Sequence, residues 1–169
     1  MTTSFFNVNH YNMQHMYNIH DIKEDNEKLK INENSILDFV IQRQQKFSNF
    51  LSLVFKSGYE KFLNDIEYTN VTLFLPINTG FNNFNINNIN KTRAIEIVSA
   101  CILNERIISE IFSNTKYSYY FTRNRSSKIL LQIDDKITIN GDIFVLQTNI
   151  NLENGIIYII NKPIIPYLI

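Results

Sequence analysis

The chain has 169 residues, and its 16 basic and 16 acidic side chains give a formal net charge of zero. That length suits one domain with a single core rather than two, and the neutral charge offers no electrostatic basis for binding nucleic acid or an anionic membrane. Asparagine and isoleucine are abundant and tryptophan is absent, a bias typical of an AT-rich coding genome.

The first 34 residues are polar, with charges gathered in the run DIKEDNEKLK and aromatic residues that follow no sustained period. We therefore predict a flexible or weakly helical extension over residues 1–34 and a single domain over residues 35–169. All three histidines lie in this extension, at His10, His15 and His20. Because a five-residue spacing spreads them around a helix, a solvated tail is favoured over a shared zinc site.

Helical signals dominate the next third of the chain. Ser35 can cap a helix over residues 36–41, and Ser48 can cap a second helix that ends at Gly58. A short third helical segment is expected over residues 59–65.

A strand then begins abruptly. Residues 71–75 are apolar on both faces, which predicts a largely buried strand. Pro76 has no N–H to donate, so we expect pairing to end there. Thr79 is expected to cap a short helical turn in which Phe81 and Phe84 share one face and lie over the strand.

A fourth helix is expected over residues 92–99, with its inward positions at Ala94, Ile95, Ile97 and Val98. A strand over 101–103 and a short helix over 105–112 follow. The single cysteine, Cys101, lies in the apolar run EIVSACIL. We interpret it as a buried small hydrophobic residue, with a reactive thiol as the alternative.

From Tyr117 onward the pattern is that of short strands separated by turn signals. The expected strands cover residues 117–123, 128–133, 136–140, 143–150 and 156–160. Helices first and strands afterwards predict an α+β fold with an antiparallel-rich sheet, because parallel pairing would need a crossover between each pair of strands.

Two segments resemble the signature motifs of fasciclin-type domains. The run TLFLPINTGF, residues 72–81, resembles the family's T-V-F-A-P-T-x-x-A-F, and NGIIYIINKPIIP, residues 154–166, resembles N-G-V-I-H-V-I-D-x-V-L-x-P. The run INGDIFVLQTNI, residues 139–150, is similar to the segment that precedes the second motif. The resemblance covers about residues 35 to 166. It implies a wedge of antiparallel-rich β-strands flanked by N-terminal and central helices.

The resemblance also implies which residues carry the fold: Thr72, Phe74, Pro76, Phe81, Asn154, Gly155 and Pro166. Gly155 is expected in a turn that needs positive φ. Pro166 is expected to close the last strand.

Five residues depart from the family pattern. Ala100-Cys101 stands where the family has a Tyr-His pair that is tied to adhesion and receptor contact. Asn149, Tyr158 and Asn161 stand where it has Asp, His and Asp. The family's fold is therefore implied, whereas integrin-type binding is not expected.

No catalytic constellation is found in the expected domain. It contains no histidine, its few glycines are isolated at turns, and no run resembles a phosphate-binding loop. The acidic pair Asp134-Asp135 is interpreted as a turn former rather than as acid–base partners. We therefore predict a protein that is not an enzyme and that holds no metal or cofactor.

The leading functional hypothesis is a protein-interaction or adhesion-type module whose partner is an unidentified protein. On a strand, Tyr117, Tyr119 and Phe121 share one face and Ser118 and Tyr120 the other; the interaction candidates are Tyr117, Tyr119 and Tyr120. The alternative hypothesis is a binder of an apolar small molecule in a cleft between sheet and helices.

Neither a signal-peptide pattern nor a window of transmembrane length is present. The sequence thus predicts a cytoplasmic protein, or one packaged into particles, with export by a non-standard route as the alternative. N-x-S/T triplets begin at Asn70, Asn90 and Asn124, and they matter only in the secretory pathway.

Overall fold

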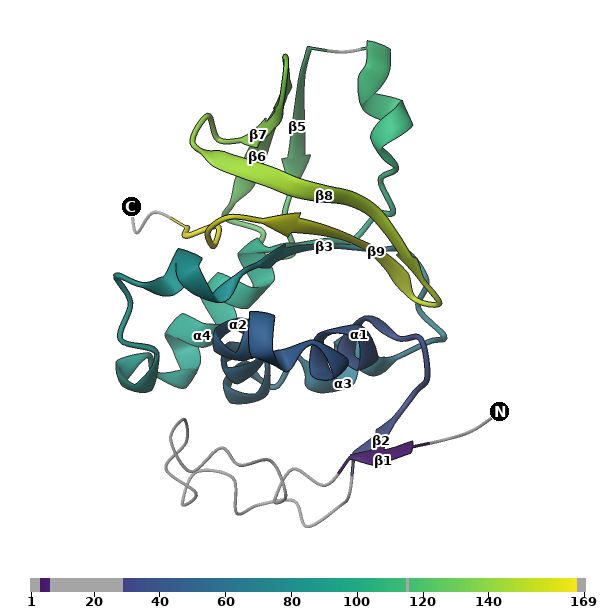
Figure 1. Cartoon of the computed structure of the whole chain (residues 1–169), viewed down its shortest axis with the longest axis vertical. Helices are drawn as coiled ribbons and strands as arrows, with labels where there is room; N and C mark the ends of the chain where they lie inside the picture. Colours follow the sequence, from purple (N-terminus) through teal and green to yellow (C-terminus); the bar gives the residue numbers. More distant parts are fainter. Residues whose placement is uncertain (1–3, 7–28, 115, 167–169) are drawn as a thin grey trace.

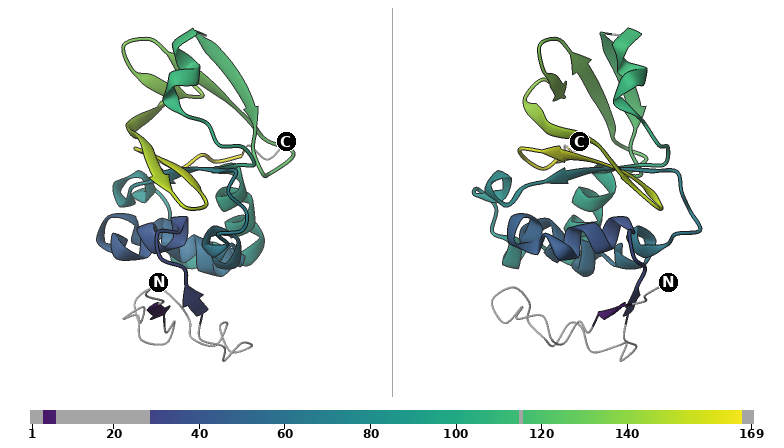
Figure 2. Two further views of the ribbon diagram at one scale, coloured as in Figure 1. Left: turned by 90° about the vertical axis from the view of Figure 1, so that its right-hand side faces the viewer. Right: turned by 45° about the vertical axis from the view of Figure 1, so that its right-hand side comes forward.

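The computed structural model describes residues 4–6, 29–114 and 116–166. A layer of helices lies against one end of a seven-stranded sheet, and the strands at the other end project away from the helices (Figures 1 and 2). The strand order is β4-β3-β9-β8-β7-β6-β5. Every pairing in this sheet is antiparallel except the one between β3 and β9, so the predicted α+β class is confirmed.

The helical layer begins with α1 (Ile36–Gln42), α2 (Gln44–Ser57) and α3 (Glu60–Asn64). Ser35 caps α1 as predicted, because its hydroxyl accepts a hydrogen bond from the Asp38 N–H. Gly58 ends α2 with a φ of 83°. The predicted cap at Ser48 is wrong: α2 begins at Gln44, and Ser48 only follows a non-helical residue inside it, Phe47.

Strand β3 (Val71–Pro76) is buried along its whole length. It lies between β4 (Ile102–Leu103) and β9 (Gly155–Ile160). Pairing continues one step beyond the expected end at Pro76, because the Ile77 N–H donates to the Ile160 carbonyl over 3.1 Å. The chain then turns through the 3₁₀ helix η3 (Asn78–Phe81).

The short helix η3 differs from the prediction at its start. It follows Ile77 without a side-chain cap, so Thr79 is not a cap residue. Phe81 is buried, as expected, and its ring lies 5.8 Å from that of Phe84. The side chain of Asn78 instead bonds to α2, where its Oδ1 accepts from the Asn49 N–H over 3.0 Å.

After the 3₁₀ turn η4 (Ile86–Asn88), α4 (Lys91–Ala100) packs on α2. Three of its four predicted inward residues are buried, but Ile95 is 38% exposed and does not face the core. Cys101 is fully buried, and this desolvation raises the pKa of its thiol to about 12. The helix expected over 105–112 is the 3₁₀ helix η5 (Ser109–Asn114), which begins four residues later.

The remaining strands follow the predicted order. They are β5 (Tyr117–Phe121), β6 (Lys128–Ile133), β7 (Ile137–Ile139) and β8 (Ile143–Leu152), followed by β9. Strand β8 contains a bulge at Asn149, whose φ is 56°. Strand β9 ends at Ile160, so Pro166 does not close it.

Two motif glycines lie where a side chain would meet neighbouring backbone. Gly155 does not have positive φ, contrary to expectation. A Cβ at Gly155 would instead lie 2.3 Å from the Val71 carbonyl oxygen, and a Cβ at Gly80 would lie 2.5 Å from the Asn161 carbonyl oxygen. Gly155 therefore makes room for the backbone just before the first motif, and Gly80 makes room for backbone of the second motif.

Asn154, in the turn between β8 and β9, joins the sheet to the helices. Its side chain is fully buried, and its Oδ1 accepts from the Ile36 N–H over 2.8 Å. Its Nδ2 donates to the carbonyls of Leu63 and Asp65 over 2.9 and 3.1 Å. One amide thus holds the start of α1 and the end of α3 against β9.

Contacts with the domain begin before residue 35, where the sequence placed its boundary. Strand β2 (Leu29–Ile31) pairs with β1 (Ser4–Phe6), and Ile31 is buried. The Asn32 N–H donates to Asn64 Oδ1 over 2.8 Å, and Asn32 Nδ2 donates to the Asn64 carbonyl over 2.7 Å. The three histidines, and most of the predicted extension, lie outside the described residues.

We expect Gly155→Ala to lower the free energy of unfolding by about 3 kcal/mol, because the new methyl group meets strand backbone that has no room to move. Gly58→Ala is the matched control: its φ is also unfavourable for alanine, but no atom lies within 4 Å, so about 1 kcal/mol should be lost. Urea unfolding measures both. An equal loss in the two variants would contradict the role of Gly155 in close packing.

Truncation tests where the domain begins. A chain starting at Leu29 should unfold within about 1 kcal/mol of the intact protein, whereas a chain starting at Ser35 should lose about 2 kcal/mol more. The second truncation removes the buried Ile31 side chain and the two Asn32–Asn64 hydrogen bonds. Thermal and urea unfolding of the two chains provide the comparison, and equal stability of both would refute this boundary.

Candidate interaction site

Strand β5 presents three aromatic side chains to solvent. Tyr117, Tyr119 and Phe121 are 52%, 66% and 74% exposed, whereas Ser118 and Tyr120 between them are half-buried. This alternation is the two-residue period of a strand with one covered and one open face. We call Tyr117, Tyr119 and Phe121 the β5 aromatic face.

The sequence-based candidates are divided between the two faces of β5. Tyr117 and Tyr119 lie on the β5 aromatic face, but Tyr120 packs against the core, where burial raises the pKa of its phenol. Phe121 was not among the candidates, although it is the most exposed of the five strand residues. Its position two residues after Tyr119 was the available signal.

Polar groups surround this apolar face. The Lys128 ammonium lies 5.3 Å from the centre of the Tyr119 ring, and that of Lys116 lies 5.8 Å from the Tyr117 ring. Lys116 also pairs with Asp134 over 3.1 Å, which raises the pKa of the lysine. Exposed aromatic rings with a charged rim have the composition of protein-binding surfaces.

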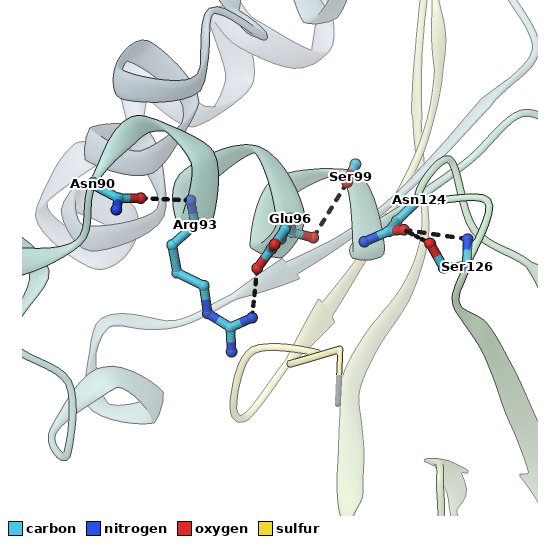
Figure 3. A network of polar contacts seen from close by, with 6 residues as sticks. All are labelled: Asn90, Arg93, Glu96, Ser99, Asn124 and Ser126. Atoms are coloured by element: carbon cyan, nitrogen blue, oxygen red, sulfur yellow. Dashed lines mark hydrogen bonds and ion pairs between the residues drawn. The ribbon is translucent and has the colours of Figure 1, made fainter. Parts of the chain in front are cut away.

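An open cleft of about 560 Å³ lies between α4, the turn that joins β5 to β6, and the C-terminal segment at residues 164–166. Figure 3 shows the side chains along its α4 side: Asn90 caps the helix by accepting from the Arg93 N–H, and Arg93 pairs with Glu96 over 2.7 Å. In the turn that joins β5 to β6, Asn124 Oδ1 accepts from the N–H of Ser126, and the Asn124 N–H donates to the Ser99 carbonyl at the end of α4 over 3.1 Å. The cleft is open to solvent and has both charged and apolar lining residues, so it is not an enclosed apolar cavity.

The residues that depart from the fasciclin pattern are buried in this domain or hydrogen-bonded within it. Ala100 and Cys101 are both fully buried, so neither presents a side chain to a partner. Asn161 Oδ1 accepts from the Phe144 N–H over 2.8 Å and thereby extends the contact of β8 with the end of β9.

Tyr158 and Asn149, which replace a histidine and an aspartate of the family motif, contact each other. The Tyr158 hydroxyl donates to the Ile107 carbonyl over 2.7 Å, with Asn149 Oδ1 as a second acceptor at 3.2 Å. Asn149 Oδ1 also accepts from the Ser109 N–H over 3.0 Å. Burial, and then the negative charge of Glu110, raise the pKa of Tyr158 well above its ordinary value.

Thr72 on β3 bonds to the same segment, residues 105–107, that Tyr158 contacts. Its hydroxyl donates to the Glu105 carbonyl over 2.6 Å and accepts from the Ile107 N–H over 3.0 Å. The segment before η5 is therefore held to the sheet by uncharged groups from both motifs.

Among the residues that the structure describes, no group of three or more histidine, cysteine or acidic side chains is placed to hold a metal ion. Asp134 and Asp135 lie in the turn between β6 and β7. The described helices include none that is long and apolar enough to cross a bilayer.

Comparisons with known proteins agree with the geometry. The family model described as "Fasciclin domain" matches residues 45–166, which confirms the resemblance inferred from the two motifs. A solved FAS1 domain pair from the insect cell adhesion molecule Fasciclin I aligns with a TM-score of 0.63 at 14% identity, covering 85% of this chain and 57% of that chain. This chain thus spans just over half the length of that pair, and the likeness concerns the fold. Among curated proteins, none matches.

Tyr158→Phe should lower the free energy of unfolding by about 1–2 kcal/mol, because it leaves the Ile107 carbonyl without its hydroxyl donor. Tyr117→Phe, which removes an exposed hydroxyl, is the control and should change little. The pKa of Tyr158 is higher in the folded state than in the unfolded state. The contribution of its hydroxyl to the free energy of unfolding is therefore complete below the ordinary tyrosine pKa of about 10 and declines as the pH rises above that value. The difference between the intact protein and Tyr158→Phe should therefore narrow in urea unfolding at about pH 11; a difference that widens would contradict this account.

Proposed function

Since this chain belongs to the fasciclin domain family, whose members are associated with cell adhesion and protein interaction, we propose that it is a protein-interaction module. Its contact surface is the β5 aromatic face. The partner is a protein, which docks on the rings of Tyr117, Tyr119 and Phe121 and meets the lysines at their rim.

The observation that carries this proposal is the exposure of three neighbouring aromatic side chains on one strand. Aromatic residues are enriched in the energetically important parts of protein interfaces, because each buries a large area with few rotatable bonds. Most large apolar side chains of this domain are buried in its core. Three rings exposed to water on one strand of a hairpin therefore favour a surface that is covered in a complex.

The alternative, an apolar small molecule between sheet and helices, has less support. The side chains between β3, β9 and the helices are almost completely buried against one another, and the described cleft is open to solvent rather than enclosed. Small apolar ligands favour concave sites that enclose most of their surface.

Affinity capture with the intact chain, read by quantitative mass spectrometry, tests the proposed surface. Tyr119→Ser and Phe121→Ser should each reduce capture of the main partner by at least about tenfold, which corresponds to ~1.4 kcal/mol. Tyr68→Ser is the matched control, because Tyr68 is an exposed aromatic residue outside the β5–β6 hairpin. Circular dichroism and thermal unfolding should show that all three variants are folded.

The capture is decisive in either direction. Loss in both β5 variants, with full capture by Tyr68→Ser, supports the proposal, and titration of the purified partner should reproduce the order of affinities. If both β5 variants retain the same partners at the same abundance, the contact surface lies elsewhere and the proposal fails.

A further inference from the structure

We propose that the β5 edge binds a second copy of this chain, through two-fold antiparallel pairing of β5 with β5 centred on Tyr119. The inference rests on the proposed function, because it assigns a partner to the same strand. In addition to the side-chain contacts of the β5 aromatic face, it includes backbone hydrogen bonds between the two copies. It also specifies the antiparallel register of the two strands.

In the β5–β6 hairpin, hydrogen-bonded and non-hydrogen-bonded residue pairs alternate. This alternation determines which backbone N–H and C=O groups of β5 point away from β6. The Thr122 N–H donates to the Ser127 carbonyl, and the Ile133 N–H donates to the Lys116 carbonyl, both over 3.1 Å. Bonded and non-bonded pairs alternate along an antiparallel ladder. The pairs that join Tyr117, Tyr119 and Phe121 to β6 are therefore non-bonded ones, and these three residues direct their N–H and C=O groups away from β6.

The outer side of β5 is the open edge of the sheet. Strand β5 is the last in the order, and the opposite edge is the two-residue, fully buried β4. Within the described part of the chain, no backbone hydrogen bond from outside the sheet reaches Tyr117, Tyr119 or Phe121. Natural edge strands are usually protected by proline, a bulge or an internal charge, and the sequence YSYYF with its regular register has none of these.

The sequence of β5 is complementary to itself. A two-fold axis through Tyr119 places Tyr119 opposite its symmetry mate and Tyr117 opposite Phe121, so aromatic residues meet across the new pairing on the open face. On the covered face, Ser118 lies opposite Tyr120. Lys116 lies opposite Thr122, so like charges do not meet along these pairs.

The same three residues thus supply two things at once: the rings of the β5 aromatic face and the outward backbone groups of the edge. Each bonded pair of residues across the axis exchanges two hydrogen bonds, and the sheet continues from one copy into the other. A foreign extended peptide would gain the backbone bonds but would not necessarily match the aromatic pairs. The symmetry of the strand therefore favours a second copy.

Charge substitution at the axis tests this geometry. Sedimentation velocity of the intact chain should show a dimer that forms with rising concentration. Tyr119→Lys and Tyr119→Glu should each weaken association by at least about tenfold, because like charges then face each other across the axis. An equimolar mixture of the two should restore the dimer, and native mass spectrometry should show one copy of each variant in it.

The variants are expected to fold, because the Tyr119 side chain is exposed and its N–H and C=O make no hydrogen bond to β6 in the non-bonded pair with Leu130. Tyr68→Lys, which adds a charge elsewhere, should leave the dimer unchanged. A chain that stays monomeric at every concentration overturns the inference, as does a mixture of the Lys and Glu variants that remains monomeric.

The outcome separates this inference from the proposed function. A monomeric chain whose capture of a different protein is lost in Tyr119→Ser retains the proposed function and overturns self-pairing. A dimer that reassembles in the mixture, from a chain whose β5 variants capture the same other proteins as before, supports self-pairing and overturns docking of a different partner on the β5 aromatic face.

Discussion

The parallel pairing of β3 with β9 is the contact on which the rest of the domain depends. It joins the two motif segments over the full length of both strands, from Val71 opposite Gly155 to Pro76 opposite Ile160. Both strands are buried from end to end. Gly155 near one end and Gly80 near the other have no side chain, and their neighbours lie so close that any side chain would push the two segments apart. The helices, β4 and β8 are all placed relative to this pair.

Buried polar groups then fix how the helical layer and the segment before η5 pack around the β3–β9 pair. Asn154 bonds to three backbone groups of the helical layer, and Thr72 and Tyr158 bond to the segment before η5. Apolar packing alone tolerates small shifts, whereas a buried amide or hydroxyl loses its partner when an element slides. Asn154 and Thr72, which match the family motifs, thus have hydrogen-bonding roles within the domain. The surface proposed for binding uses neither of them.

Much of the fold was predictable because its signals are local. Ser35, Gly58 and the turns between the later strands have side chains or backbone preferences that act within a few residues. The role of Gly155 was not predictable, since the atom it avoids belongs to Val71, far away in the sequence. The parallel partner of β9 has no local signature for the same reason.

The candidate site was predictable only in part. The two-residue period identified which β5 residues share a face, but it does not say which face is covered. The packing of Tyr120 against the core decides that, and tertiary contacts of this kind cannot be read from the strand itself. Ser48 shows a similar limit: a residue with a suitable side chain becomes a helix cap only where the preceding backbone leaves the helix.

The position of β9 near the C-terminal end of the domain has a consequence for folding during synthesis. Strand β3 is made early, yet its parallel neighbour is the last strand of the domain to be synthesised. Until then β3 lacks the partner along one whole side, and its apolar residues are open to contact with other chains. Contacts between segments so distant in sequence also close slowly. The nascent chain is therefore most vulnerable to aggregation in the interval between the synthesis of these two strands.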